Sequence, residues 1–339
     1  MDIQNYDPHA GGQAGVILGE PNEIYHANPA ISHSNVCEFI ERPKKFEGRH
    51  ITGELNDRNE TAAMAFGTAA HTLILEGQEV FNKEYSVAPD LKFVGKESKA
   101  NAVQVLNSLL INPFPPEQVA YLAAAKKDEI EEFFAQHPGR KIITEPDMET
   151  LGRMAASIQR SKIATLLLSG GLPEVVFRTE KGDAPFAVQC RTDYLNIEGN
   201  ALTNGEPYVV DLKTILDMAM WDTEFKKRHY YQAYPHYTKT IEWVTETQVK
   251  HFFWVAVEKE WPYSVLIKHG DARDWKAGLA RMDRGISAME GCYKSGNFDD
   301  GWSESIQINS LSQYDADREP HMGLWSEAET PNAEAVTAQ

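Results

Sequence analysis

Apolar and polar residues follow a helical period in the first half of the chain and a strand period in the second. Apolar residues recur at spacings of three and four from about residue 32 to residue 168, which predicts a succession of amphipathic helices. The period then changes to two, and the runs that predict strands are 174–179, 186–195, 207–214, 249–259 and 262–269. Helical patterns return over 217–243 and 272–295. This order predicts an α/β fold with a central mixed β-sheet flanked by helices and a helical N-terminal half.

Capping and turn residues set the limits of the first predicted helices. Ser32 or Ser34 is a good N-cap for a helix that Pro43 ends. A second helix is predicted over about 60–76. Residues 86–100 lack helical periodicity and predict a loop.

Composition divides the chain into a body and two ends. Residues 1–22 are rich in Gly, Pro and Asn and predict a flexible N-terminus. Residues 23–298 carry the periodic patterns of a single domain. Residues 299–339 lose apolar density and are acidic, with eight acidic residues and one basic residue from position 300 onward. Such a composition predicts a disordered C-terminal tail.

The charge and cysteine content narrow the class of protein. The net charge is −17, from 33 Lys and Arg against 50 Asp and Glu, which argues against sequence-blind binding to DNA or to anionic membranes. This net charge is still compatible with a local basic groove or with a metal site made of carboxylates. Three widely spaced cysteines predict neither a disulfide framework nor a zinc cluster. With no signal-peptide pattern and no apolar run long enough to span a bilayer, a cytoplasmic protein without a membrane partner is expected.

Charged residues interrupt two of the predicted strands. In "PYVVDLKT", Asp211 and Lys213 are two residues apart, so they point to the same side of a strand. In "FAVQCRTDYL", Gln189, Arg191 and Asp193 share one side, opposite the side that we expect to face the core. If these strands form a hairpin, the two aspartates lie close together, and neighbouring carboxylates repel unless a proton or a cation lies between them. Mg²⁺ prefers carboxylate oxygens, and a lysine beside it is suited to orient or deprotonate a water, or to neutralise charge on a phosphate.

Two further residues extend this constellation. Glu174 opens the preceding strand and adds a third carboxylate, and His71 lies in the Ala- and Gly-rich helix "AMAFGTAAHTLILEG". Each has an ordinary structural interpretation: a strand start for Glu174, a hydrogen-bonded core residue for His71, and a surface ion pair for Asp211 and Lys213. Their order along the chain favours a functional site: a helix His, a strand Glu, a strand Asp, a strand Asp-x-Lys and then a helix with Gln and Tyr.

These stretches together resemble the RecE-type exonucleases (exodeoxyribonuclease VIII), in the RecB/RecE branch of the PD-(D/E)xK nuclease superfamily. The resemblance covers about residues 24–270, and the segments that carry it are "YHANPAISHSNVCEFIERPKKF", "FGTAAHTLILEG", "PEVVF", "VQCRTDYL", "YVVDLKT" and "HYYQAYPHY". It implies the PD-(D/E)xK nuclease fold. It also implies a metal site for Mg²⁺, for which Mn²⁺ can substitute, held by His71, Glu174, Asp193 and Asp211. Lys213 would then be the catalytic base or the charge stabiliser.

The resemblance also assigns residues to catalysis and to DNA. Gln232 matches the Gln of the family's Gln-x-x-x-Tyr helix and is expected to contact a phosphate or a water, although His236 stands where the tyrosine belongs and Tyr237 follows it. The basic run in "FKKRHYY" is either a phosphate grip or a solvated helix face. The residues expected to bind DNA are Lys226, Lys227, Arg228, Arg191 and Tyr237. Some relatives bind an iron–sulfur cluster through four cysteines, so three scattered cysteines predict no such cluster here.

The activity that the resemblance implies is a Mg²⁺-dependent exonuclease that degrades one strand of linear double-stranded DNA. It implies 5′→3′ polarity, phage or prophage origin in a bacterial cytoplasm, and partnership with a RecT-like single-strand annealing protein in recombination. RecE-type domains form ring tetramers, and a ring would keep an acidic protein on DNA. Two alternatives stay open: an endonuclease of the same fold that is structure-specific or cuts single strands, and a non-catalytic DNA-binding or assembly protein that kept the fold.

Overall fold

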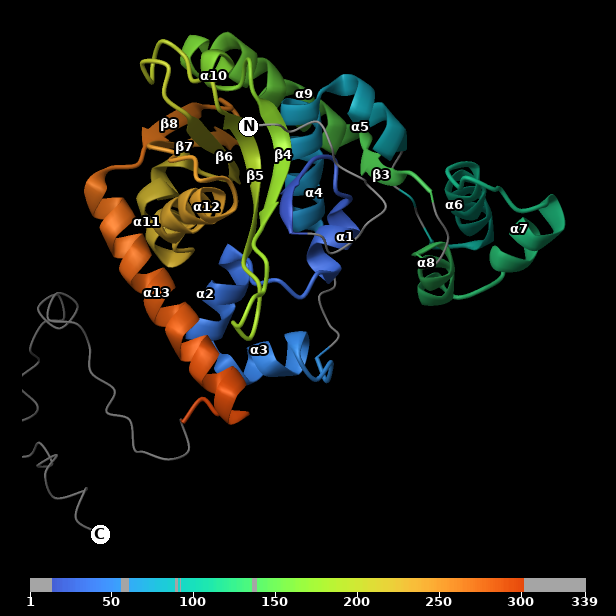
Figure 1. Cartoon of the computed structure of the whole chain (residues 1–339). Coiled ribbons are helices and arrows are strands. Elements are labelled where there is room, and N and C mark those ends of the chain that lie inside the picture. The colour runs from blue at the N-terminus through green and yellow to red at the C-terminus, as the bar shows by residue number, and fades with distance from the viewer. Residues whose placement is uncertain (1–13, 56–60, 89–90, 92, 136–138, 302–339) are drawn as a thin grey trace, which may run out of the picture. The chain divides into compact units, whose positions relative to one another are not determined.

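A six-stranded mixed sheet forms the centre of the protein, with strand order β1-β4-β5-β6-β7-β8 (Figure 1). The computed structural model describes residues 14–55, 61–88, 91, 93–135 and 139–301. The strands of this sheet are β1 (Gly15–Ile17), β4 (Leu172–Arg178), β5 (Gln189–Asn196), β6 (Tyr208–Ile215), β7 (His251–Glu258) and β8 (Val265–His269). Strands β6 and β7 are parallel, and the other neighbouring pairs are antiparallel. The predicted α/β fold is confirmed.

Helices precede, connect and follow these strands. The helices before β4 are α1 (Asn22–Ala27), α2 (His33–Glu41), α3 (Pro43–His50), α4 (Ala62–His71), α5 (Gln78–Glu84), α6 (Lys96–Ser108), α7 (Pro116–Leu122), α8 (Lys127–Ala135), α9 (Glu145–Arg160) and α10 (Lys162–Leu167). The helices after β6 are α11 (Trp221–Lys227), α12 (Tyr230–Thr245) and α13 (Ala272–Ser295). Of the two predicted N-caps, Ser32 caps α2, and Pro43 is the first residue of α3. In the described part of the chain, no helix is long and apolar enough to cross a membrane.

Helices cover both faces of the sheet, so its central strands are buried on both sides. Val210 and Leu212 of β6 pack with residues of α4 and α9 on one face. Val209 of β6 packs with residues of α11 and α12 on the other. Strands buried on both faces read as nearly continuous apolar runs, as β6 and β7 do. The expectation of a polar side on β5 is therefore wrong: Gln189 and Asp193 are only 2% and 9% exposed.

The N-terminal segment is held to the sheet edge rather than loose. Strand β1 pairs with β4, and the Arg178 guanidinium donates to both carboxylate oxygens of Glu20, over 3.1 and 2.8 Å. Both side chains are almost fully buried. The prediction of a flexible N-terminus is wrong for residues 15–22, whereas residues 1–13 lie outside the described part of the chain. The predicted C-terminal tail also lies outside it after residue 301.

Three predicted elements differ in detail. The helix expected over 60–76 is divided into α4 and a π-helix, η1 (Thr72–Glu76). The loop and helices expected over 86–168 contain two short strands, β2 (Tyr85–Ala88) and β3 (Lys141–Thr144), which form a separate parallel pair. The helix expected over 217–243 is divided into a 3₁₀ turn, η2 (Met218–Met220), followed by α11 and α12.

Helix α13 closes the outer side of α12 and also contacts α2 (Figure 1). Two glycines allow this close packing. A Cβ on Gly278 would lie 2.3 Å from the backbone oxygen of Tyr231, and one on Gly285 would lie 2.7 Å from side-chain atoms of Val36 and Ile40. Larger residues at these positions would separate α13 from the two helices that it supports.

Candidate active site

The candidate site lies where β5 and β6 separate. These two strands pair only through Tyr194–Asn196 and Tyr208–Val210, so the first half of β5 diverges from the second half of β6. The Asp193 carboxylate lies in this gap and accepts a hydrogen bond from the Leu212 N–H over 2.6 Å. It thereby replaces a missing bond of the strand ladder. The predicted proximity of Asp193 and Asp211 results from this gap, because Leu212 follows Asp211 directly.

The backbone carbonyl of Leu212 fixes the orientation of His71. Its Nε2 lies 3.0 Å from the Leu212 carbonyl oxygen, which can only accept, so Nε2 carries the proton and donates. Nδ1 of the neutral ring therefore keeps its lone pair. Ligand histidines commonly donate their second ring N–H to a backbone carbonyl in this way.

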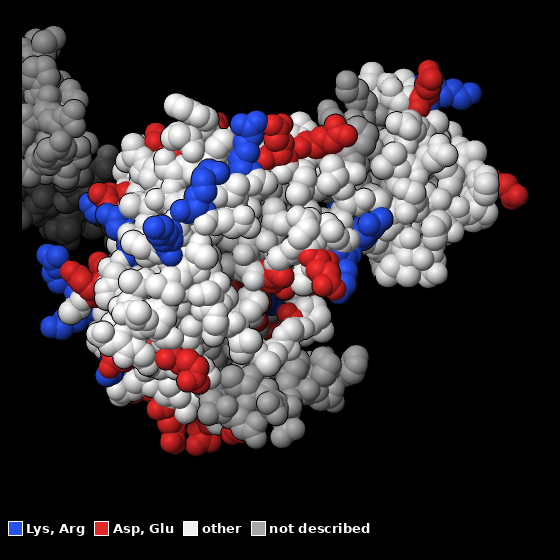
Figure 2. All heavy atoms as spheres, turned by 90° about the horizontal axis from the view of Figure 1, so that it is seen from above, with Lys and Arg blue, Asp and Glu red and all other residues white. Residues whose placement is uncertain are grey.

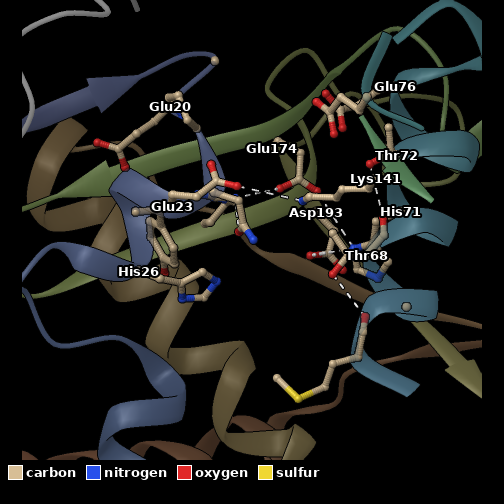
Figure 3. Close-up of a pocket in the computed structure, with 18 of the residues that line it drawn as sticks. Glu20, Glu23, His26, Thr68, His71, Thr72, Glu76, Lys141, Glu174 and Asp193 are labelled. Atoms are coloured by element: carbon tan, nitrogen blue, oxygen red, sulfur yellow. Dashed lines mark hydrogen bonds and ion pairs between the residues drawn. The ribbon is translucent and has the colours of Figure 1, made fainter. Parts of the chain in front are cut away.

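Three candidate ligand atoms converge here: Nδ1 of His71 and one carboxylate oxygen each from Glu174 and Asp193 (Figure 3). Nδ1 of His71 lies 3.9 Å from a carboxylate oxygen of Glu174 and 3.7 Å from one of Asp193. In the described residues these three form the group of His, Cys, Asp and Glu side chains that could hold a metal, with ligand atoms within 4.8 Å of one another. Burial lowers the pKa of His71, but the carboxylates of Asp193 and Glu174 raise it more, so the net shift is upward.

Glu174 reaches this group from an unusual backbone conformation. Its φ is 51°, in the left-handed region that a non-glycine residue seldom adopts. On β4 it lies between Pro173 and Val175, which pair with Tyr194 and Thr192 of β5. Residues held in such conformations are concentrated at functional sites.

Asp211 and Lys213 form a buried ion pair beside this group. The Lys213 ammonium donates to Oδ1 of Asp211, and Asp211 is 1% exposed. Burial raises the pKa of Asp211 to about 6, against the lowering effect of Lys213 and with a further rise from Asp193. Burial lowers the pKa of Lys213, but Asp211 and Asp193 outweigh it and raise the value. Oδ2 of Asp211 is buried and makes no hydrogen bond with any described residue.

The site opens into a cavity of about 820 Å³ between the sheet, α4 and the N-terminal segment. Figure 3 shows Glu20, Glu23 and His26 on the side opposite His71. Lys141 of β3 lies 3.9 Å from Glu23 of α1, so two segments far apart in the sequence meet at its rim. A cavity of this size accommodates several groups of a polymeric substrate.

Arg191 connects the N-terminal wall to the acidic group. Its guanidinium lies 4.2 Å from the centre of the Tyr25 ring, donates to Oδ1 of Asn22 over 3.0 Å, and lies 3.6 Å from Glu174. It also lines the cavity. In this arrangement Arg191 orients Glu174 and α1, and its contact with DNA stays a prediction.

Glu76 also lines the cavity, and sequence reasoning missed it. In a regular α-helix Glu76 and His71 would point about 140° apart, at 100° per residue. The π-helix η1 changes this, because its bonds join residues five apart, as from Gly77 N–H to the Thr72 carbonyl. Burial, followed by the charge of Glu174, raises the pKa of Glu76 to about 7. The Glu in "HTLILEG" carried no signal of this in the sequence.

Of the other residues predicted for catalysis or DNA binding, Tyr237 lines the cavity, whereas Gln232 and the basic residues at the end of α11 do not. Burial raises the pKa of the Tyr237 phenol well above the usual value. Gln232 is fully buried and accepts from the Cys37 thiol over 3.6 Å, so it packs α12 against α2; its catalytic role stays a prediction. The basic residues Lys226, Lys227 and Arg228 are exposed at the end of α11 and do not line the cavity. They adjoin Tyr230, whose ring centre lies 5.4 Å from the Lys213 ammonium.

A family model and one solved structure agree with this fold. A family model described as "PDDEXK-like domain of unknown function (DUF3799)" matches residues 32–309. No curated protein matches the sequence. The crystal structure of a "Putative exonuclease" from Eubacterium rectale is similar, with a TM-score of 0.51 and 12% identity over 88% of this chain and 96% of that chain. The structure of SSO0001 gives a TM-score of 0.26 and 13% identity over 65% of this chain and 84% of that chain.

Proposed function

The chain belongs to the family of PDDEXK-like domains of unknown function, DUF3799, and on this premise we propose that it is a Mg²⁺-dependent DNA exonuclease. It hydrolyses phosphodiester bonds in one strand of linear double-stranded DNA. The observation that carries the proposal is the convergence of His71, Glu174 and Asp193 beside the Asp211–Lys213 ion pair. These residues come from α4, β4, β5 and β6, so their convergence favours a reaction centre over a set of separate structural roles.

The residues present fit a divalent metal ion. His71 has a neutral tautomer with Nδ1 directed at two carboxylates, and Asp211 has a buried oxygen that no described residue satisfies. Buried polar atoms are normally paired, so an unpaired carboxylate oxygen at this place is consistent with a ligand atom. His71, Glu174, Asp193 and Asp211 would hold the ion. When bound, Mg²⁺, or Mn²⁺ in its place, activates water and stabilises charge on phosphoryl oxygens.

The protein's own groups then have distinct tasks. Lys213 supplies positive charge beside Asp211, where it orients the attacking water and stabilises the negative charge that develops on the phosphate. The Lys213 ammonium also lies over the Tyr230 ring, which provides a cation–π contact in addition to the Asp211 carboxylate. Arg191 keeps Glu174 in position from the N-terminal wall.

The contacts with DNA are local rather than general. On the face seen in Figure 2, basic side chains form a short row and small groups among acidic ones, and no broad basic surface is visible in the part of the chain that the structure describes. We assign phosphate contacts to Lys226, Lys227 and Arg228, close to Lys213, and a further contact to Tyr237. Because log affinity falls with log salt concentration in proportion to the number of phosphate contacts, these few contacts should give a modest salt dependence.

The finer function follows from the resemblance to RecE-type exonucleases. We propose 5′→3′ degradation from duplex ends in a bacterial host cytoplasm, 3′ overhangs as products, and a RecT-like single-strand annealing protein as partner. We also propose a ring-shaped homo-tetramer encoded by a phage or prophage. The similarity to a structure described as an exonuclease supports action from ends over internal cutting.

The test incubates the protein with Mg²⁺ and two substrates, an end-labelled linear duplex and a covalently closed circle of the same sequence. We expect degradation of the linear duplex and an intact circle. Labels on the 5′ and 3′ ends of separate samples give the polarity. Cutting of the circle would overturn the exonuclease assignment in favour of an endonuclease. No cutting of either substrate with Mg²⁺ or Mn²⁺ would overturn the nuclease itself.

A further inference from the structure

The turn between β7 and β8 leaves the sheet at the C-terminal ends of β6 and β7, the end of the sheet at which Lys213 lies. Strands β6 and β7 are parallel, with Lys213 beside Ala256 and Ile215 beside Glu258. The next residue, Lys259, donates its backbone N–H to the Ile215 carbonyl over 2.9 Å. The turn "EKEWPY" therefore projects beyond the ends of the two strands, close to the segment that carries the active site.

Trp261 is exposed at the tip of this turn. Its side chain is 83% exposed, more than Tyr121 at 78% and far more than Trp243 at 50%. A depression of about 400 Å³ adjoins it, lined on the other side by α9. Gly152 and Ala156 form the small-residue surface of α9 there. An indole beside an open space with so little covering it is unusual for a structural tryptophan.

Charged side chains of α9 lie beside the indole. Arg153 and Arg160 line the same depression together with Glu149, which forms an ion pair with Arg153. The Arg153 guanidinium lies 5.8 Å from the centre of the Tyr263 ring, and Arg160 donates to the Ser157 hydroxyl over 2.7 Å. The Lys259 ammonium lies 5.0 Å from the centre of the Phe66 ring. Two arginines beside one exposed aromatic side chain, with Lys259 in the same turn, are suited to an anionic ligand with flat, apolar faces.

Lys259 also connects this surface to the active-site helix. Burial and the Arg228 charge lower the pKa of Lys259, and the Asp147 carboxylate raises it. Phe66 belongs to α4, the helix that ends in His71. Basic residues thus occur at the end of α11, in this turn and on α9, in a chain with a net charge of −17. This local arrangement of basic residues suits the phosphate groups of a DNA strand better than it suits the surface of an acidic protein.

We propose that Trp261 is a stacking platform for single-stranded DNA, with Arg153, Arg160 and Lys259 as its phosphate contacts. This inference rests on the proposed nuclease function and deepens it, because it assigns a path to a strand that has been separated from its complement. An unpaired base can stack on the indole, whereas a duplex base has both faces covered by its neighbours.

The experiment measures the affinity of the full chain for a fluorescent oligo(dT) and for a blunt duplex of equal length, by anisotropy in EDTA. Trp261→Ala should weaken oligo(dT) binding about tenfold and duplex binding much less, and Trp261→Phe should restore most of the loss. Arg160→Gln should reduce the slope of log affinity against log salt by about 0.7. The controls are Trp243→Ala, on the helix that covers the opposite face of the sheet, and Arg273→Gln, whose side chain is 93% exposed. Melting temperatures show that each variant is folded.

Several outcomes would overturn this inference. Equal affinities of Trp261→Ala and Trp243→Ala for oligo(dT) would leave the indole without a role in DNA binding and would favour a protein partner for this surface. Equal losses for oligo(dT) and duplex would contradict the preference for single strands. If the wild-type protein degrades linear duplex while Trp261→Ala binds normally, only this inference fails. If the wild-type protein neither cuts nor binds DNA, the proposed function fails with it.

Discussion

At the scale of single residues, the peptide groups of Leu212 organise the candidate site. The N–H holds Asp193 and the carbonyl holds His71, while the neighbours on either side are Asp211 and Lys213. One residue of β6 therefore places four side chains of the candidate site. A shift in the register of β6 would displace all of them together, which explains why a buried, doubly covered strand carries the site.

Asp193 has a structural task as well as a proposed metal-binding one. Charge repulsion alone predicts that its removal is neutral or stabilising without metal, but Asp193→Ala leaves the buried Leu212 N–H without a partner. We expect Asp193→Ala to lower the free energy of unfolding by about 1–3 kcal/mol in EDTA. Asp193→Asn keeps an acceptor oxygen and should lose less. Mg²⁺ should raise the melting temperature of the wild type and of neither variant. A normal Mg²⁺ shift in Asp193→Asn would remove Asp193 from the ligand set.

Lys213 acts on the reaction and not on metal binding in this scheme. We expect Lys213→Ala to reduce the cleavage rate on the order of 100-fold or more, since positioned acid–base and charge-stabilising groups contribute at least that much. The Mg²⁺-induced rise in melting temperature should persist, because no ligand is lost. Lys268→Ala, at an exposed position of β8, is the matched control. Near-normal cleavage by Lys213→Ala would return the Asp211–Lys213 pair to a purely structural role.

At the scale of secondary-structure elements, one buried ion pair fastens β1 to the edge of the sheet. We expect Glu20→Ala to cost about 3–5 kcal/mol of stability, because it leaves the Arg178 charge buried beside Gln189 with its carboxylate removed. The double variant Glu20→Ala/Arg178→Met should lose less than the single one. Chemical denaturation measures both. A loss below about 0.5 kcal/mol in Glu20→Ala would show that this segment detaches without unfolding the domain.

Two neutral histidines lie between α2 and α12, His33 and His236, with ring centres 6.0 Å apart. Burial lowers the pKa of His236 from 6.5 to about 4, and that of His33 to about 3. Above pH 6.5 neither the folded nor the unfolded state holds the proton. Below it the unfolded state binds protons that the folded state excludes, so acid destabilises the packing of α2 on α12.

This linkage predicts a pH-dependent stability. Between about pH 6 and pH 4.5, each histidine should contribute a loss of about 1.4 kcal/mol per pH unit. His236→Gln keeps a donor for the Gln189 carbonyl, which His236 contacts over 3.0 Å, and removes one titrating group. Its free energy of unfolding should therefore fall less steeply with pH, as measured by denaturation at several pH values. An unchanged slope would mean that His236 is protonated in the folded state.

At the scale of the whole molecule, an acidic protein has to stay on an acidic polymer. The phosphate contacts available to the described residues are local, and salt screens them over a Debye length of about 8–10 Å. A closed ring of subunits would retain DNA by topology instead of by charge. The chain should therefore assemble into a cyclic homo-oligomer, with the end of α11 facing the channel.

Light scattering should give four times the 38.1 kDa mass of one chain. A challenge with excess unlabelled duplex after the reaction has begun should leave degradation of the labelled DNA nearly unaffected, because an enclosed strand does not exchange. Degradation that stops within a few nucleotides of the challenge, together with a monomeric mass, would contradict the ring. It would leave the assignment of the catalytic residues intact.

Local patterns in the sequence were enough to predict most of the central strands and to suggest the candidate site. Strands β4 to β8 and helix α13 were predictable because their patterns are local and periodic, and Asp211-x-Lys213 was visible because charges are rare in buried strands. The family's order of His, Glu, Asp and Asp-x-Lys then indicated a nuclease fold, and the family match confirmed a PDDEXK-like domain.

The way in which these residues meet could not be predicted from local patterns. The gap between β5 and β6, the tautomer of His71 and the pairing of β1 depend on contacts between residues far apart in the chain, which no local pattern encodes. Glu76 joined the cavity because a π-helix replaced the expected α-helix. Trp261 became a candidate for stacking because of its exposure, and exposure is a property of the packed molecule rather than of the residue type.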